Sequence, residues 1–266
     1  MLRQRLATAL VAIPLLTWLI LSASEAIYAS VVLAVTFLSL RELANMQRVG
    51  IYGATMLTTG AGMTIALAML VDSTGATLSA AIVVALIGIL LGTLATAEDM
   101  SRSVVGAGQI LFAALYGGLL LPHLIWLRSI DHGPGLVFFV LASAMASDAG
   151  GYFAGRAWGH RKLWPVVSPN KTVEGAVGSV ASAVVIGTLF QMVFVGRFGF
   201  LESLVVTATL SLLAQIGDLS ESMIKRAYDA KDSGWILPGH GGVLDRTDSM
   251  VLPIVFTYYY ASLTWV

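Results

Sequence analysis

The chain has 266 residues, of which 57% are hydrophobic and 11% are charged, and its formal net charge is zero. Soluble domains carry about 25% charged residues, so a chain this poor in charge could not cover its surface in water. The zero net charge predicts no nucleic-acid partner, and the lack of cysteine excludes disulfides and cysteine-based metal sites.

Several apolar stretches reach the roughly 20 residues that cross a bilayer as a helix. In chain order there are nine, at residues 5–22, 26–45, 51–71, 77–97, 104–127, 135–158, 172–195, 200–222 and 248–265. The first follows Arg3 and Arg5, as in a signal peptide, but its apolar part is longer than the usual ~7–15 residues, so we interpret it as a helix. The sequence therefore predicts an all-α polytopic membrane protein with about nine transmembrane helices.

We expect one membrane domain over residues 1–266, with N-terminal helices in 1–130 and the helices and loops of the functional site in 131–266. Nine spans would place thirteen of the fifteen basic residues on the side of the N-terminus and leave only Arg128 and Arg197 on the other. Basic residues favour the cytoplasmic side of a membrane. This pattern predicts a multi-pass protein of the cell membrane with a cytoplasmic N-terminus and cytoplasmic polar loops.

The sixth apolar stretch contains an acidic residue, Asp148, near its middle. An aspartate inside a membrane normally faces the bundle interior or a wet cavity, so Asp148 could bind substrate or metal, or hydrogen-bond a neighbouring helix. Gly151, Gly155 and Gly159 follow at intervals of four, which indicates close helix packing.

The polar segment after this stretch contains Ser168, Pro169 and Lys171. We expect Ser168 to be the N-cap of the seventh span, with Pro169 in its first helical position and Lys171 in its third. A helix N-terminus with a nearby lysine is a candidate anion site. The alternative is a capped membrane helix with a lysine that reaches toward the interface.

Residues 218–248 hold ten of the thirty charges. Asp218, Glu221, Ser222 and Lys225 are spaced to share one helix face. Asp245 and Asp248 stand three residues apart at the start of the last span. Carboxylates from two helix ends can converge on Mg²⁺, which prefers oxygen ligands. We therefore expect Asp218, Asp245 and Asp248 to form a metal site.

The other polar residues of this stretch suit an anionic ligand. The basic residues are Lys225, Arg226, Lys231 and Arg246, whose side chains suit phosphate oxygens. Gly241 and Gly242 allow backbone N–H groups to approach a ligand. His240 could contact a phosphate, transfer a proton or be structural. Further upstream, Arg41 and Glu42 are expected to mark an interfacial helix end.

The run SMIKRAYDAKDSGWILPGHGGVLDRTD, residues 222–248, closely resembles the defining motif of the phosphatidate cytidylyltransferases, also called CDP-diacylglycerol synthases. The upstream runs SDAGGYFAGRAWG and SPNKTVEG resemble further segments of that family, and GDLSES leads into the motif. The resemblance covers residues 140–250 in terms of motifs, whereas the N-terminal spans match in hydropathy alone.

The resemblance implies transfer of a cytidylyl group from CTP to phosphatidic acid in phospholipid biosynthesis, within a bilayer and in a homodimer. It implies Mg²⁺, with Mn²⁺ as an alternative and room for a second cation. The implied catalytic residues are Asp218, Lys225, Arg226, Asp245, Arg246 and Asp248. The implied substrate-binding residues are Asp148, Ser168, Lys171, Ser222, Lys231, Asp232, His240, Gly241 and Gly242.

Two other functions compete with this interpretation. The first is a related membrane enzyme that uses CTP with a different lipid acceptor. The second is a transporter or channel whose pathway is lined by Asp148. A transporter predicts polar residues inside several spans, whereas the first, third, fourth and ninth spans contain few.

Overall fold

The computed structural model describes residues 2–47, 49, 51–71, 75–234 and 241–265, and most of these are helical. Helices dominate because backbone polar groups inside a bilayer must pair within their own segment. The elements are α1 (Leu2–Leu21), α2 (Glu25–Met46), α3 (Ala54–Val71), α4 (Ala76–Thr96), α5 (Met100–Leu115), the π-helical turn η1 (Tyr116–Leu120), α6 (His123–Ser129), α7 (Gly133–Trp158), β1 (Lys162–Trp164), β2 (Ser168–Thr172), α8 (Val173–Phe194), α9 (Phe200–Ala227) and α10 (Leu244–Thr264).

Each of the nine expected spans corresponds to one helical segment, with bounds that differ by a few residues. Within the described ranges, seven segments are long and apolar enough to cross a membrane. The other two are α1, whose described side chains include the apolar stretch Ala12–Leu21, and α10, whose first turns carry three charged residues. The chain is an all-α polytopic membrane protein, and its described residues include one small hairpin.

The fifth span, expected as one helix over 104–127, is interrupted by η1 between α5 and α6. Pro122 follows this turn and precedes α6. A proline lacks the N–H group that a continuous helix needs, so the helix must restart there. Within η1, Gly118 lies so close to the backbone of Gly62 in α3 that a side chain would not fit. The interrupted segment therefore packs tightly on α3.

The polar connection after α7 folds as an antiparallel hairpin of β1 and β2. The prediction that Ser168 caps the seventh span was wrong, because Ser168 pairs with Trp164 across this hairpin. Since residues 168–172 belong to a strand, the helix begins only after Thr172. Thr172 is the N-cap, and its Oγ1 accepts a hydrogen bond from the Gly175 N–H at 3.1 Å. Lys171 thus lies on the strand and not in the first helical turn.

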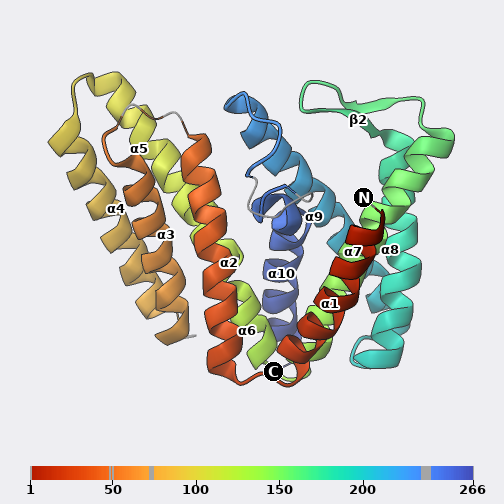
Figure 1. Cartoon of the computed structure of the whole chain (residues 1–266). Coiled ribbons are helices and arrows are strands. Elements are labelled where there is room, and N and C mark those ends of the chain that lie inside the picture. The colour runs from red at the N-terminus through yellow and green to blue at the C-terminus, as the bar shows by residue number, and fades with distance from the viewer. Residues whose placement is uncertain (1, 48, 50, 72–74, 235–240, 266) are drawn as a thin grey trace.

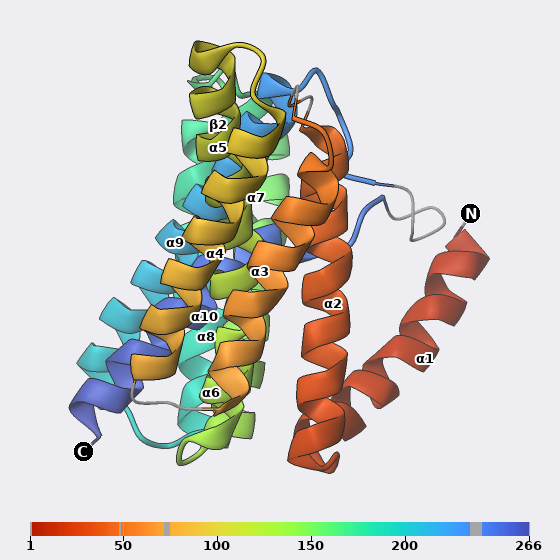
Figure 2. The same cartoon turned by 90° about the vertical axis from the view of Figure 1, so that its left-hand side faces the viewer.

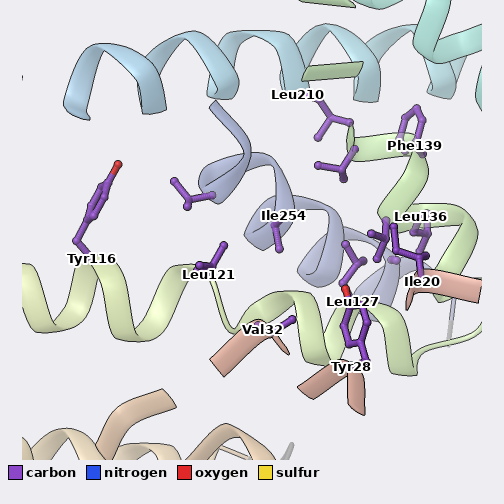
Figure 3. Packing of buried hydrophobic residues seen from close by; sticks show 14 of the residues in the cluster. Ile20, Tyr28, Val32, Tyr116, Leu121, Leu127, Leu136, Phe139, Leu210 and Ile254 are labelled. Atoms are coloured by element: carbon purple, nitrogen blue, oxygen red, sulfur yellow. The ribbon is translucent and has the colours of Figure 1, made fainter. Parts of the chain in front are cut away.

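Two hydrophobic clusters hold the helices together. The larger cluster joins α9 and α10 to α1, α2, α6 and α7 (Figure 3), and its members include Ile20, Val32, Leu127, Phe139, Leu210 and Ile254. The smaller cluster joins α3, α4 and α5 through Ile65, Ile89 and Ile110. Burial of these side chains fixes α9 and α10, which carry most of the predicted site residues, against the rest of the bundle.

The polar connections separate to two ends of the bundle. The hairpin, the C-terminal end of α9 and the α4–α5 connection lie at one end, whereas α6 and the α1–α2 connection lie at the other (Figure 1). At this second end, Arg128 donates hydrogen bonds to the carbonyl oxygens of Ile20 and Ala23 at 2.8 and 2.6 Å. Helix α1 meets the bundle there and diverges from α2 toward its N-terminus (Figure 2).

Candidate active site

Helices α9 and α10 approach closely at the end of the bundle that carries the hairpin. A side chain at Gly217 in α9 would overlap the carbonyl oxygen of Asp248 in α10, so only glycine permits this spacing. Asp218 follows Gly217 directly. As a result, Asp218 and Asp248 lie close enough for their negative charges to repel each other. The two helix ends therefore converge as the sequence predicted.

A lysine of the hairpin forms an ion pair with Asp218. The Nζ of Lys171 on β2 lies 2.6 Å from Oδ2 of Asp218, and both side chains are about 30% exposed. The Oγ of Ser222, one turn along α9, donates a long hydrogen bond to Asp218 at 3.4 Å. The structure thus brings three predicted site residues from two segments together at a position that remains open to a ligand.

A second lysine, Lys225, lies between two carboxylates. Its Nζ donates a hydrogen bond to Oδ1 of Asp245 at 2.6 Å and forms an ion pair with Glu221 on its own helix. The Glu221 side chain is 0% exposed, and those of Lys225 and Asp245 are 13% and 10% exposed. A buried charge without a partner is costly, so these three groups depend on one another.

Asp245 also binds the backbone of the polar stretch between α9 and α10, which covers residues 228–243. Its Oδ2 accepts hydrogen bonds from the Ser233 N–H at 3.0 Å and the Gly242 N–H at 2.8 Å. Both oxygens of Asp245 are therefore engaged by donors of the protein itself. This carboxylate links α9, α10 and the two described ends of the stretch.

Asp148 on α7 joins the same region. Its Oδ2 accepts a hydrogen bond from Ser249 Oγ at 3.2 Å, and its charge repels those of Asp218 and Asp248. The sequence left open whether Asp148 binds a ligand or a neighbouring helix. Its contact with Ser249 on α10 is a helix–helix hydrogen bond, and Ser249 directly follows Asp248.

The remaining predicted residues lie on α9, α10, the hairpin and the connection between α9 and α10. Arg226 is exposed and donates a hydrogen bond to the Ala230 carbonyl at 3.2 Å. Lys231, Asp232 and Arg246 are also exposed. Ser168 lies in the hairpin at its pairing with Trp164, away from the helix terminus that was predicted for it.

The glycine-rich run is described only at its end. Gly241 has a φ of +80°, a left-handed conformation that favours glycine. Gly242 is buried and donates its N–H to Asp245. The prediction for His240 lies outside the described residues.

One residue of this region was misjudged from the sequence. Glu42, expected to mark an interfacial helix end, is 3% exposed. Its carboxylate accepts hydrogen bonds from residues at both described ends of the polar stretch. Its position within an apolar span could have predicted this burial, because an acidic residue there is costly unless it is paired or functional.

The carboxylates of this region suit a divalent cation that also binds a substrate. Within the ranges that the structure covers, no three Asp, Glu, His or Cys side chains form a ready-made metal cage. Mg²⁺, however, usually takes one or two protein carboxylates together with water and substrate phosphates. Asp148, Asp218 and Asp248 repel one another, and a cation would relieve that repulsion. The donor chemistry therefore fits Mg²⁺, best at Asp218 and Asp248.

Several known proteins are similar to this chain over about half of their length. The phosphatidate cytidylyltransferase of Bacillus subtilis is 45% identical over 157 residues, which is 59% of this chain and 58% of the relative. That of Staphylococcus saprophyticus is 42% identical over 156 residues, covering 58% of this chain and 59% of the relative. That of Haemophilus influenzae is 40% identical over 134 residues, covering 48% and 46%.

The aligned part thus spans less than two thirds of the length of each of these relatives. The model of the cytidylyltransferase family matches residues 3–264, which includes the N-terminal helices as well as the motif region. The chain therefore belongs to the cytidylyltransferase family.

Proposed function

We propose that the protein transfers a cytidylyl group from CTP to phosphatidic acid and so forms CDP-diacylglycerol and pyrophosphate. One observation carries the proposal: α9, α10 and the hairpin bring Lys171, Asp218, Lys225, Asp245 and Asp248 to one end of a membrane bundle. Family membership and the names of the relatives support the same reaction.

In this reaction an oxygen of the phosphatidate phosphate attacks the α-phosphorus of CTP. A new P–O bond forms, and the bond between the α-phosphorus and the oxygen bridging to the β-phosphate breaks, which releases pyrophosphate. Such transfers depend mainly on alignment of the reactants and on neutralisation of phosphate charge. The chain needs no nucleophile of its own.

We assign the phosphate contacts to Lys171, Lys225, Arg226 and Arg246. Lys171 is the best placed, because its ammonium group pairs with a carboxylate that is about 30% exposed and can turn to an incoming phosphate. Further substrate contacts are assigned to Asp148, Ser168, Ser222, Lys231, Asp232, His240, Gly241 and Gly242. Of these, Ser222 donates a hydrogen bond to Asp218 at 3.4 Å.

Mg²⁺ is the proposed cofactor, held by Asp218, Asp245 and Asp248, with Mn²⁺ as an alternative and a second cation allowed. When bound, it would neutralise phosphate charge and steady the leaving pyrophosphate. Asp245 already accepts hydrogen bonds from Lys225 and two backbone N–H groups. We therefore propose Asp218 and Asp248 as the main metal ligands.

The proposal places the site on the cytoplasmic face of the cell membrane. The acyl chains of the lipid would stay in the bilayer while its phosphate meets CTP from the cytoplasm. Thirteen of fifteen basic residues on one side of nine spans support this orientation. A homodimer is part of the proposal, and native mass spectrometry in detergent tests it.

The test is an assay of the purified full-length chain with labelled CTP and phosphatidic acid, with and without a chelator. We expect CDP-diacylglycerol and pyrophosphate in equal amounts, and no product once the divalent cation is removed. Asp248→Asn should abolish turnover and still insert in the membrane. Transfer to another lipid phosphate but not to phosphatidic acid would show that the acceptor is a different lipid. Solute flux without CTP turnover would overturn the proposal.

A further inference from the structure

A buried carboxylate on α2 holds the start of α10, which lies 201 and 202 residues further along the chain. Glu42 lies in the last turns of α2 and is 3% exposed. Its Oε1 accepts a hydrogen bond from the Val243 N–H at 2.9 Å, and its Oε2 accepts one from the Leu244 N–H at 2.9 Å. The Oγ of Ser233 also donates to Oε2, at 3.1 Å. Three donors from two segments thus converge on one side chain.

Helix α10 needs such an acceptor because it lacks a local cap. The residue at its N-cap position is Val243, whose side chain has no acceptor, and no side-chain cap is formed there. The first N–H groups of a helix have no partner within the helix and must find one elsewhere. A carboxylate is the favoured partner, since this end of the helix carries partial positive charge. Glu42 supplies that carboxylate.

The surrounding backbone is fitted closely to the Glu42 side chain. A Cβ atom built on Gly234 would lie 2.5 Å from Glu42 Oε1, and one built on Gly242 would lie 2.5 Å from Oε2. Neither position has room for any side chain other than hydrogen. The two described ends of the polar stretch therefore pass directly over the carboxylate, which fixes their path.

Ser233 connects this carboxylate to the candidate active site. Its hydroxyl donates to Glu42, whereas its backbone N–H donates to Asp245 at 3.0 Å. Asp245 in turn binds Lys225 at 2.6 Å, and Asp248 follows one turn later on α10. We propose that Glu42 is a positioning residue that holds Ser233 and the first turn of α10, so that Asp245 and Asp248 keep their places opposite α9. This inference rests on the proposed cytidylyl transfer.

The first test measures the hydrogen bonds directly and needs no activity. Glu42→Gln keeps the size of the side chain but turns an NH₂ group toward backbone donors, so at least one acceptor is lost. We expect faster amide hydrogen exchange at Val243 and Leu244 in this variant, measured by mass spectrometry of peptides covering 241–248. Glu25→Gln is the matched control, because Glu25 lies exposed at the other end of the same helix.

The second test measures turnover. Residues that orient a catalytic group through a hydrogen bond typically contribute 10- to 100-fold to activity, so kcat of Glu42→Gln should fall roughly 10- to 100-fold. KM for CTP should change by no more than about threefold, since Glu42 touches no substrate in this scheme. The Glu25→Gln control should keep the wild-type kcat.

Ser233→Ala removes one of the three donors and leaves both backbone hydrogen bonds to Glu42. We expect its kcat to fall about 3- to 10-fold. The double variant Glu42→Gln with Ser233→Ala should be no slower than Glu42→Gln alone, because both changes break one linkage. Should Glu42→Gln fail to fold, the kcat of Ser233→Ala and its exchange at 241–248 decide the question.

The outcomes separate this inference from the proposed function. A wild-type chain without CTP turnover would defeat the proposed function, whatever the exchange data show. An active wild type together with wild-type kcat and exchange in Glu42→Gln would defeat the positioning role alone. Losses that add in the double variant would also count against it, since independent effects add.

Discussion

Two lysines neutralise carboxylates in this site, but their surroundings differ. Lys171 and Asp218 are each about 30% exposed, so their pair can open to admit a phosphate. We predict that Lys171→Gln lowers kcat/KM for CTP or phosphatidic acid about 10- to 100-fold, since a hydrogen bond to a charged group contributes about 1.5–3 kcal/mol. Steady-state kinetics in detergent micelles measures this change.

The same hairpin offers a control for that prediction. Lys162 lies on β1, where its side chain is exposed, and it pairs through its backbone with Thr172. Lys162→Gln should leave kcat/KM within about twofold of the wild type, because exposed substitutions change energies by about 0.5 kcal/mol or less. Equal losses in both variants would indicate a general effect of charge and not a phosphate contact at Lys171.

Lys225 has a structural role that Lys171 lacks, because its partner Glu221 is 0% exposed. We predict that Lys225→Met lowers the free energy of unfolding by about 3–5 kcal/mol, the usual cost of leaving a buried charge unpaired. Adding Glu221→Gln should restore part of this stability but none of the turnover. Thermal unfolding in detergent and the CTP assay measure the two effects; a Lys225→Met chain as stable as wild type would contradict the prediction.

At the residue scale, spacing along the chain predicted much of the site. Asp218, Glu221 and Lys225 share a face of α9 because helical residues three, four and seven apart do so. Their meeting with Asp245 and Asp248 was also expected, since both helix ends were placed on one side of the membrane. Glu42 could not be assigned in this way, because its partners lie 191–202 residues away and depend on how α2 packs.

Helices α7 and α8 form the tightest helix pair of the site region through small residues. A Cβ atom on Gly178 of α8 would overlap Ala154 and lie 3.0 Å from the Gly150 carbonyl oxygen of α7. We predict that Gly178→Ala lowers the free energy of unfolding by about 1–3 kcal/mol through overpacking. Activity should fall too, since α7 carries Asp148 and α8 follows the strand that carries Lys171.

The control for this prediction is a helical glycine with free space. No heavy atom lies within 4 Å of a Cβ placed on Gly88 of α4. Gly88→Ala should keep the wild-type stability or raise it by up to about 1 kcal/mol, as expected from helix propensity alone. A comparable loss in both variants would mean that glycine itself, and not the α7–α8 contact, was responsible.

At the element scale, hydropathy located the helices but not their interruptions. Apolar runs predict where a helix can cross, and all nine runs correspond to helical segments. The packing glycines of α7 were also identified from their spacing: Gly151 and Gly155 lie against α8 and its cap. The cap itself was misplaced, because Ser168 and Thr172 both suit an N-cap and only the pairing of β1 with β2 selects the second.

The whole molecule has two chemically distinct ends, which makes its orientation testable. The segment Met100–Ser129 runs from the end of the bundle that carries the hairpin to the opposite end (Figure 1). Ser101 lies in the first turn of α5, and Ser129 is the last residue of α6. Both serines are exposed, and the chain has no cysteine of its own, so single cysteines can be introduced without background. Serine and cysteine are similar in size, which favours native folding of both variants.

If the site faces the cytoplasm, a membrane-impermeant maleimide added to intact cells should label Ser129→Cys and not Ser101→Cys. Both variants should be labelled after the membrane is permeabilised, and both should keep CTP turnover. The expectation follows from the excess of basic residues at the end that carries Ser101, because the cytoplasmic side retains such residues. Labelling of Ser101→Cys alone would reverse the topology and put the carboxylates on the side of the membrane where CTP is absent.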